Sequence, residues 1–399
     1  MLPHQIPILL GGGSDLLFHA PLLTSTALLK GLGSATFTRA TTATVWGYDA
    51  SDNWGLLTIP SGEPRFGGAR YLGSGVWSDT LSTGVAIPDS TLLGYLSEAL
   101  RFNITHWNRD LTNAEWVKTN CTAAKDQTGI DNTTNSASSL TATAGNATCL
   151  QTLTRSSVQR ILGCWIKRIT GSGTINMTYD NGGTWTPVTV TSSWTRVSIP
   201  AVTSANPVFG FQIVTNGDAI AVDYVQHEEA AFLSSDIATT TATVTRNADI
   251  LTYSPTGNID KDKGTMYAEH TTPATFSTNA TVFYADDNSS NNRLGIRNGS
   301  GNNGAAIVSN NVIAFNSTAG TTVVANTRYK AGMRWRMDDM AFIDSGAVKG
   351  TDTSGAMPLS LTQISVGERI STEHLFGYVR NAKIWKRPLS DAVLKGMTL

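Results

Sequence analysis

The feature of this sequence that most constrains its fold is a regular succession of short apolar segments separated by glycine and asparagine turns. Between about residues 102 and 237, segments such as RILGCWIKRI, GTINMTYD, WTRVSIPA and DAIAVDYVQHE follow one another at roughly ten-residue spacing. The DNGG sequence at Asp180–Gly183 is a strong hairpin signal, because Asn-Gly readily adopts the positive φ angles of a tight turn. Together the spacing and the turn residues predict an antiparallel β-sandwich.

A second series of such segments follows the threonine-rich connector ATTTATVTRNAD. From about residue 249 onwards, GTMYAEHTT, TVFYADD, TRYKAGMRWR and YVRNAKIWK again have the residue types of successive strands, which predicts a second two-sheet sandwich. The last strand is expected to end before Pro388, because proline cannot donate to a strand ladder. Ser390 then stands at the N-cap position of a short C-terminal helix.

The first 99 residues have a different pattern, with many glycines and short apolar segments of no steady periodicity. We expect short strands there and one short helix, DSTLLGYLSEALR, beginning at Asp89. Such a region is poor at forming its own core but suited to ordering against a partner surface. The sequence thus predicts an all-β chain in three parts: an irregular N-terminal region at 1–99, a first sandwich at 100–237 and a second sandwich at 247–399.

The composition excludes several classes of partner. Charged residues make up only 15% of the chain and the formal net charge is −1, which argues against nucleic-acid binding. No stretch approaches the roughly 20 apolar residues of a membrane-spanning helix, and the N-terminus lacks the basic segment of a signal peptide. The cysteines at 121, 149 and 164 have no metal-binding spacing; a Cys121–Cys149 bridge and reduced thiols both fit them, and we expect reduced thiols.

Three sets of motifs resemble known families. The strand GCWIKRI, the strand WTRVSIPA and the late strand VDYVQHEE resemble the jelly-roll module of the carbohydrate-binding family 4/9 type. NTRYKAGMRWRMDDMAFIDSG, LTQISVGER and the RPLSD tail resemble the concanavalin A-like, laminin-G-like lectin sandwich. The order of FTRATTAT, GEPRF and NAEWVKTN ahead of these two modules resembles virion proteins of tailed bacteriophages. This last resemblance implies a location on the particle surface, with the N-terminal region anchored on other virion proteins.

The resemblances imply a non-enzymatic structural protein, such as a head fibre, a decoration protein or a tail appendage, in contact with host polysaccharide. The alternative is a dedicated carbohydrate-binding adhesin or receptor-binding tail fibre. We also expect a homo-oligomer, and a trimer in particular, because fibres are commonly closed cyclic assemblies. A surface of few charges can be buried between subunits without leaving charges unpaired.

An enzymatic role is not expected. Lectin-like sandwiches include glucanases, whose two catalytic carboxylates lie about 5–9.5 Å apart across the scissile bond. The acidic residues of the last region show no E-x-D-x-x-E arrangement: Glu269, Asp286, Asp287, Asp338, Asp339, Glu368 and Glu373. We therefore predict no catalytic residues.

Aromatic side chains are the expected sugar-binding groups, because sugar rings stack their C–H faces on them. Tyr179 and Trp185 flank the DNGG turn and are the first candidates, while Trp107 and Trp77 lie in irregular sequence and are weaker ones. The resemblance to the jelly-roll family also implies a structural Ca²⁺ near the late strand, with Asp223 as a ligand. No other cofactor is expected. The tryptophans inside strands are expected to pack within the fold: Trp165, Trp194, Trp335 and Trp385.

Overall fold

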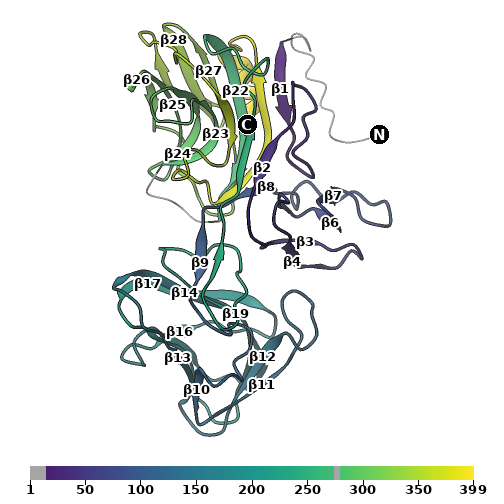
Figure 1. Ribbon diagram of the computed structural model, residues 1–399, viewed down its shortest axis with the longest axis vertical. Coiled ribbons are helices and arrows are strands. Elements are labelled where there is room, and N and C mark those ends of the chain that lie inside the picture. The colour runs from purple at the N-terminus through teal and green to yellow at the C-terminus, as the bar shows by residue number, and fades with distance from the viewer. Residues whose placement is uncertain (1–14, 274–278) are drawn as a thin grey trace. The chain divides into compact units, whose positions relative to one another are not determined.

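The computed structural model describes residues 15–273 and 279–399, and within them the chain is nearly all β (Figure 1). The described residues contain 31 strands and one helix, so the prediction of an all-β fold is confirmed. The chain forms two compact units. Unit 1 comprises Met1–Arg39, Gly62–Ala99 and Ala248–Leu399, and unit 2 comprises Ala40–Ser61 and Leu100–Asn247.

Unit 2 contains two antiparallel sheets (Figure 1). The first has the strand order β10-β13-β18-β15-β16; its strands are β10 (Trp116–Thr119), β13 (Ala147–Thr152), β15 (Ile175–Thr178), β16 (Thr186–Val188) and β18 (Val208–Ile213). The second has the order β11-β12-β19-β14-β17, with β9 beside β19 and β20 beside β9; its strands are β9 (Arg101–Asn103), β11 (Cys121–Gln127), β12 (Ala137–Ala142), β14 (Val158–Thr170), β17 (Thr195–Ser204), β19 (Ala219–Glu228) and β20 (Val244–Arg246).

The core of unit 2 follows from strand alternation. Leu162, Cys164 and Ile166 are fully buried on one face of β14, and Phe209 and Phe211 face them from β18. The expected sandwich therefore closes over one hydrophobic core. The three thiols are unpaired, with those at 149 and 164 buried in this core and the thiol at 121 half-buried.

A hairpin from the N-terminal region also belongs to unit 2. Its strands are β3 (Ala43–Tyr48) and β4 (Trp54–Ile59), paired in register from Tyr48 opposite Trp54. The Thr44 hydroxyl donates to the carbonyl of Asp236 at 2.7 Å, and the Trp46 ring packs on Trp165 at a centroid distance of 5.1 Å. Unit 2 is therefore more than the continuous stretch that the sequence predicted.

Unit 1 contains two larger antiparallel sheets and a short hairpin. One sheet has the order β29-β28-β27-β22-β31-β8-β5, with β1 also paired to β31; its strands are β1 (Leu16–Ala20), β5 (Phe66–Gly67), β8 (Gly94–Ser97), β22 (Lys263–Thr271), β27 (Arg328–Arg336), β28 (Asp339–Asp344), β29 (Ala347–Asp352) and β31 (Gly377–Trp385). The other has the order β2-β21-β30-β23-β24-β25-β26; its strands are β2 (Thr36–Thr38), β21 (Ile250–Tyr253), β23 (Ala280–Asp286), β24 (Arg293–Gly299), β25 (Asn302–Ser309), β26 (Val312–Ser317) and β30 (Gln363–Val366). The hairpin joins β6 (Arg70–Gly73) and β7 (Val76–Ser78).

The expectation of a separate, irregular region at 1–99 differs from the structure. Phe18 of β1 is fully buried and lies 5.1 Å from the Tyr253 ring and 5.7 Å from the Phe283 ring, centroid to centroid. The described part of this region supplies strands to both units, because its short apolar segments complete sheets that begin elsewhere in the chain. Residues 1–14 lie outside the described residues. The expectation about a signal peptide, and most of the apolar N-terminal stretch, fall on these residues.

The helix expected from Asp89 is also wrong, because Gly94–Ser97 forms strand β8. Pairing with β31 outweighs the local helix propensity, and Gly94 has φ of 105° in a place where a Cβ would lie 2.5 Å from the carbonyl oxygen of Val379. The predicted end of the last strand before Pro388 and the short helix after it are confirmed. Strand β31 ends at Trp385, and the Ser390 side chain accepts from the Val393 N–H at the start of α1 (Asp391–Thr398).

A buried ion network joins the three chain segments of unit 1. The Arg39 guanidinium donates to Asp249 at 3.0 Å, and Arg65 donates to both Asp249 and Glu98. The side chains of Arg39, Arg65 and Asp249 are fully buried. Each member lies within three residues of a point where the chain enters or leaves unit 1, so the network ties those crossing points together.

Candidate saccharide site in unit 2

The candidate site is built on Arg109, which follows β9. Its guanidinium donates to Asp223 at 2.7 and 3.0 Å and to Asp131 at 2.7 and 2.9 Å. It also lies over the Tyr224 ring, 4.2 Å from the centroid. Burial raises the pKa of Asp223 although Arg109 opposes it. At the less buried Asp131, burial also acts to raise the pKa, but Arg109 together with hydrogen bonds from Thr133 and Ser136 outweighs it, so the net shift is downward. Both carboxylates are thus held as partners of one cation.

Residues 129–136 form a loop that closes over this ion cluster. The Ile130 N–H donates to Asp223 at 3.0 Å, and the Ser136 hydroxyl accepts from Arg109 at 2.8 Å. A Cβ at Gly129 would lie 2.2 Å from the Ser136 oxygen and 2.5 Å from the Arg109 guanidinium, so only glycine fits this approach. The ion cluster therefore fixes the position of the whole loop.

A cavity of about 270 Å³ lies beside this loop. Trp107 is half-buried in its wall, with φ of 50°, and packs in part against the core of unit 2. Its backbone N–H donates to the Thr240 carbonyl at 2.7 Å. The other lining residues are mostly polar: Arg109, Asp110, Lys125, Thr133, Thr134, Asn135, Ser136, Ala238, Thr239 and Thr240. The cavity thus brings one indole together with hydroxyl, amide and charged groups.

The charged groups of the cavity are largely paired. Lys125 is 40% exposed, and its ammonium lies 3.4 Å from Asp110. Burial raises the pKa of Asp110, but hydrogen bonds from Thr112 and the charge of Lys125 outweigh it, so the net shift is downward. The side chains of Thr133, Thr134 and Asn135 are exposed and available to a ligand. This arrangement can stack a sugar ring and hydrogen-bond its hydroxyls.

Tyr179, the first predicted sugar contact, lies in a different place. It is only 8% exposed, and its hydroxyl accepts from the Leu162 N–H at 2.7 Å and donates to the Ile199 carbonyl at 3.3 Å. Its edge contributes to a second cavity, of about 290 Å³, lined by Tyr179, Asp180, Thr184, Thr186, Ile199, Pro200, Val202, Thr203 and Ser204. The phenol is occupied within the protein, so this residue belongs to the core.

Trp185 stabilises its own turn. The Asp180 carboxylate accepts from the Thr178 hydroxyl at 2.7 Å and from the Thr184 N–H at 2.8 Å. The Trp185 ring lies over Gly182, where a Cβ would approach the indole to 2.7 Å. One face of the half-buried ring is therefore used inside the hairpin, as the predicted tight turn requires, and Trp185 lines neither cavity of unit 2.

Trp77 and Asp223 are also placed away from their predicted roles. Trp77, in unit 1, is 7% exposed and packs against Tyr71 and Phe66. Asp223 is fully buried and both of its oxygens accept from Arg109, so a guanidinium stands where a Ca²⁺ was expected. The donor set at Asp223 does not fit a metal, and within 15–273 and 279–399 no three His, Cys, Asp or Glu residues cluster as ligands.

The open face of the sheet β10-β13-β18-β15-β16 offers no stacking position. Because Trp116, Cys149 and Phe211 point into the core, the alternate residues point away from it. The outward positions hold no aromatic and no charged side chain: Val117, Thr119, Thr148, Leu150, Thr152, Asn176, Thr178, Pro187, Val208, Gly210 and Gln212. Two of them pair with each other, since the Asn176 amide donates to Gln212 at 2.8 Å.

The aromatic cluster on the β3–β4 hairpin was not among the predicted sugar-binding positions. Trp54 is 44% exposed and lies 5.0 Å from the Tyr48 ring and 6.1 Å from the Trp46 ring. A signal was present, because WGYDASDNWG places aromatic residues on both sides of a turn rich in Asp and Asn. Trp107, one of the predicted sugar contacts, lies in unit 2 as the hairpin does, whereas Trp77, another predicted contact, lies in unit 1.

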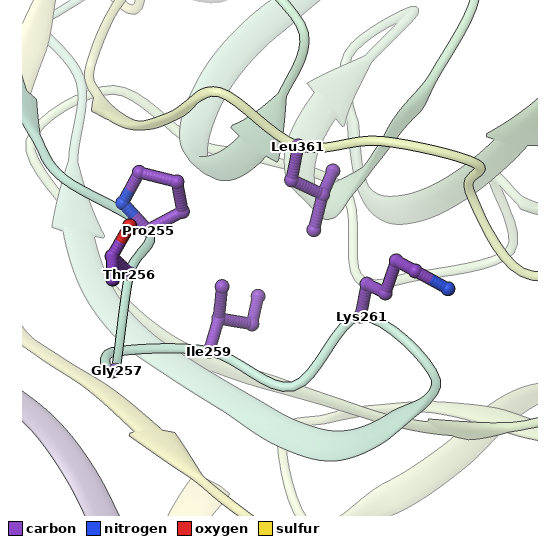
Figure 2. A pocket seen from close by; sticks show the side chains of 6 residues that line it. All are labelled: Pro255, Thr256, Gly257, Ile259, Lys261 and Leu361. Carbon is purple, nitrogen blue, oxygen red and sulfur yellow. The ribbon is translucent and has the colours of Figure 1, made fainter.

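Unit 1 has a cavity of about 210 Å³ that lacks these features. Figure 2 shows Pro255, Ile259 and Leu361 around it, with the amine of Lys261 pointing away from their aliphatic side chains. Thr256 and Gly257 complete the lining. No aromatic residue lines this cavity, so it provides no surface for stacking a sugar.

No protein-family model matches the chain, and no curated protein matches it. Among solved structures the chain is similar to domain 4 of AbnA, a GH43 extracellular arabinanase from Geobacillus stearothermophilus in complex with arabinotriose, with a TM-score of 0.34 and 8% identity over 42% of this chain and 82% of that one. It is also similar to the Ruminococcus gnavus IT-sialidase CBM40 bound to alpha2,3 sialyllactose, with a TM-score of 0.30 and 12% identity over 35% of this chain and 83% of that one.

A third likeness extends over more of the chain. A putative carbohydrate binding protein from Bacteroides ovatus matches 75% of this chain and 84% of its own, with a TM-score of 0.27 and 9% identity. At such scores and identities these likenesses carry no conclusion about function. The chain's own sheets establish the fold class, which is all-β with antiparallel sandwiches.

Proposed function

We propose that this protein is a non-catalytic glycan-binding protein that holds a saccharide in the Trp107 cavity of unit 2. The observation that carries the proposal is the presence, in one cavity, of an indole and several exposed hydroxyl and amide groups. Indole rings receive the C–H faces of sugars, and such polar groups fix their orientation. The ion cluster under loop 129–136 holds the polar groups in place before a ligand arrives.

The other cavities support this role less well. The cavity beside Tyr179 is walled by Ile199, Pro200 and Val202, and its one aromatic ring is buried. The cavity of unit 1 has no aromatic ring at all. Neither combines a stacking surface with polar groups as the Trp107 cavity does.

The carboxylates of unit 1 support a binding role rather than catalysis. Glu269 pairs with Arg380 at 2.9 Å and accepts from the Asn381 amide at 2.8 Å. Asp286 is fully buried and accepts from Ser365 and Gln363, each at 2.9 Å. We expect no release of reducing sugar from bacterial envelope polysaccharides, and a release that disappears in Glu269→Gln or Glu368→Gln would refute the non-catalytic part of the proposal.

The test of binding uses the full-length protein on an array of neutral and acidic glycans, including bacterial surface polysaccharides. We expect binding that Asn135→Ala weakens and Trp107→Ala abolishes, with circular dichroism to verify that the second variant is folded. Lys261→Ala, at the cavity of unit 1, is the matched control and should bind as the wild type does. Silence of the wild-type protein across the array would contradict the proposal.

The place of action is part of the same proposal and rests on the sequence resemblance alone. We propose that the protein lies on the surface of a tailed-phage particle, anchored to other virion proteins by its N-terminus and assembled as a trimer. Anchoring is tested with a truncated protein that lacks residues 1–14. The truncation goes no further because Phe18 belongs to the core of unit 1. Particles that incorporate the truncated protein normally would refute the anchor, and monomers in light scattering and on the particle would refute the trimer.

No helix of the described residues is long and apolar enough to span a membrane.

A further inference from the structure

We infer that Trp54 is a second sugar-stacking position, so that the ligand of unit 2 is a linear, neutral oligosaccharide that runs from the Trp107 cavity to the β3–β4 hairpin. This inference rests on the function proposed above. Trp54 is 44% exposed, and it is the only aromatic among the exposed large hydrophobic residues of the described ranges. Part of the ring contacts Tyr48 and Trp46, and at this exposure the rest of its surface is open to a ligand.

The hairpin that carries Trp54 is rigid. The Asp49 carboxylate accepts from the Ser51 N–H at 2.8 Å, from the Asn53 N–H at 2.9 Å and from the Asn53 amide at 3.0 Å. The Asp49 N–H donates in turn to the Asn53 carbonyl at 2.9 Å, and Asp52 has the φ of 66° that such a turn requires. Trp54, the next residue, therefore starts β4 from a fixed position.

The ring of Trp54 is also oriented by its neighbours. Tyr48 meets it edge-on, at 5.0 Å and an interplanar angle of 68°, and Trp46 lies at 6.1 Å. Trp46 itself packs on Trp165, whose indole N–H donates to Asp236 at 3.1 Å. Because these contacts hold the ring before binding, little conformational entropy is lost when a sugar stacks on it.

Loop 129–136 contacts the backbone of Trp54 and also borders the Trp107 cavity. The Asn132 amide donates to the carbonyl of Trp54 at 3.1 Å, and a Cβ at Gly55 would meet the same amide at 2.6 Å. Thr133, the neighbour of Asn132, lines the cavity. Since adjacent Cα atoms are about 3.8 Å apart, one short loop borders both positions, and a chain of a few sugar units can extend over it.

The charges of the site favour a neutral saccharide. Three carboxylates, those of Asp110, Asp131 and Asp223, lie around two cations, Arg109 and Lys125. Both cations are thereby paired, so neither of them is left as a partner for the carboxylate of an acidic sugar. Asn132 and Thr133 expose polar groups along the path, and no large aliphatic residue is exposed beside Trp54 on the hairpin or the loop, which favours a glycan over a protein partner.

The experiment measures the affinity of the full-length protein for neutral gluco-, manno-, galacto- and xylo-oligosaccharides, from monosaccharide to hexasaccharide, beside a ladder of uronic-acid oligomers. We expect affinity to rise with chain length in one neutral series. Trp54→Ala should remove that rise and lower the hexasaccharide affinity roughly tenfold, equivalent to the loss of one good contact. Trp194→Ala is the matched control, because its half-buried ring packs against Lys167 and lines neither cavity of unit 2.

The outcomes separate the two proposals. A wild-type protein that binds no ladder overturns the proposed function and this inference with it. If affinity rises with chain length and Trp54→Ala does not change this rise, the inference is overturned but the proposed function is not. The same holds if the uronic-acid oligomers bind more tightly than the neutral ones. If the Trp54→Ala variant does not fold, Trp54→Leu is used instead, because leucine keeps an apolar side chain at this position but has no aromatic face. Loss of chain-length dependence in either variant, with the control unaffected, supports the inference.

Discussion

The two units both contain a cluster of arginine and carboxylate side chains, and the clusters differ in position. In unit 1, Arg39, Arg65 and Asp249 are fully buried and come from three separate chain segments. In unit 2, Arg109 is 18% exposed, and its partners come from the same continuous stretch of chain as the arginine does. The first cluster joins segments that the sequence separates widely, and the second holds one loop beside a cavity.

This difference indicates that similar ion pairs serve different purposes according to their solvent exposure. Removing one member of a fully buried cluster leaves charges with no access to water, which is costly. Removing one member of the partly exposed cluster leaves a cation that water can reach, so the loss falls more on loop position than on stability. A substitution in the unit 1 cluster should therefore lower mainly stability, whereas a substitution in the unit 2 cluster should lower mainly saccharide binding.

The largest effect is expected for Asp249→Asn in unit 1. The substitution removes the buried carboxylate that Arg39 and Arg65 share, so the free energy of unfolding should fall by about 3–5 kcal/mol. Urea unfolding measures the loss, and hydrogen exchange should place it in the strands of unit 1. Asp262→Asn, which removes the exposed pair with Lys261, is the control and should change stability by less than about 0.5 kcal/mol. Equal effects of the two variants would contradict the structural role of the network.

A smaller loss of stability with a larger loss of binding is expected for Asp223→Asn in unit 2. Arg109 keeps Asp131, so the free energy of unfolding should fall by roughly 2 kcal/mol. Asparagine has one acceptor oxygen where Asp223 has two, so it cannot hold both Arg109 and the Ile130 N–H as the carboxylate does, and saccharide affinity should fall at least several-fold. Isothermal titration with the best saccharide of the array, together with urea unfolding, gives both values. Unchanged affinity at reduced stability would show that the cluster does not position the loop.

The buried histidines give a third comparison, through pH. Burial lowers the pKa of His227 in unit 2 to about 3, with help from Arg160, and lowers those of His19 and His270 in unit 1 to about 4. Between these values and the unfolded pKa near 6.5, the unfolded chain binds more protons, so stability falls as the pH falls. From pH 6.5 to 5, each of these three histidines should cost about 1.5 kcal/mol, so His19 and His270 together should cost unit 1 about twice what His227 costs unit 2.

His227→Leu isolates the contribution of unit 2. Neither ring nitrogen of His227 has a hydrogen-bond partner, and the ring packs against Phe209 at 4.5 Å, so an apolar replacement should be neutral or stabilising at pH 7.5. Its pH dependence should be flatter than that of the wild type in the strands of unit 2 and unchanged in those of unit 1. Hydrogen exchange at two pH values checks this, and identical slopes in wild type and variant would refute the assignment.

The sequence revealed the local structure better than the long-range structure. The DNGG turn, strand β31 and the cap at Ser390 depend on adjacent residues, and all three are present. The pairing of β8 with β31 and the burial of Phe18 depend on partners more than 200 residues away, which periodicity does not reveal. For the same reason Trp107 was found as a weak candidate and Trp54 was missed, because loop 129–136 connects them only after folding.

The smallest effect is expected for Trp185→Ala, which separates a loss of stability from a loss of binding. The ring covers Gly182 on one side of its own turn and is otherwise half-exposed, so its loss should lower the free energy of unfolding by about 1 kcal/mol. Because Trp185 lines neither cavity of unit 2 and makes no contact with loop 129–136, saccharide affinity should not change. The variant thus serves as a destabilised control for Asp223→Asn, measured by the same titration and urea unfolding. If Trp185→Ala weakens binding as much as Asp223→Asn does, binding follows the overall stability of unit 2, and the Arg109 cluster has no separate role in positioning the loop.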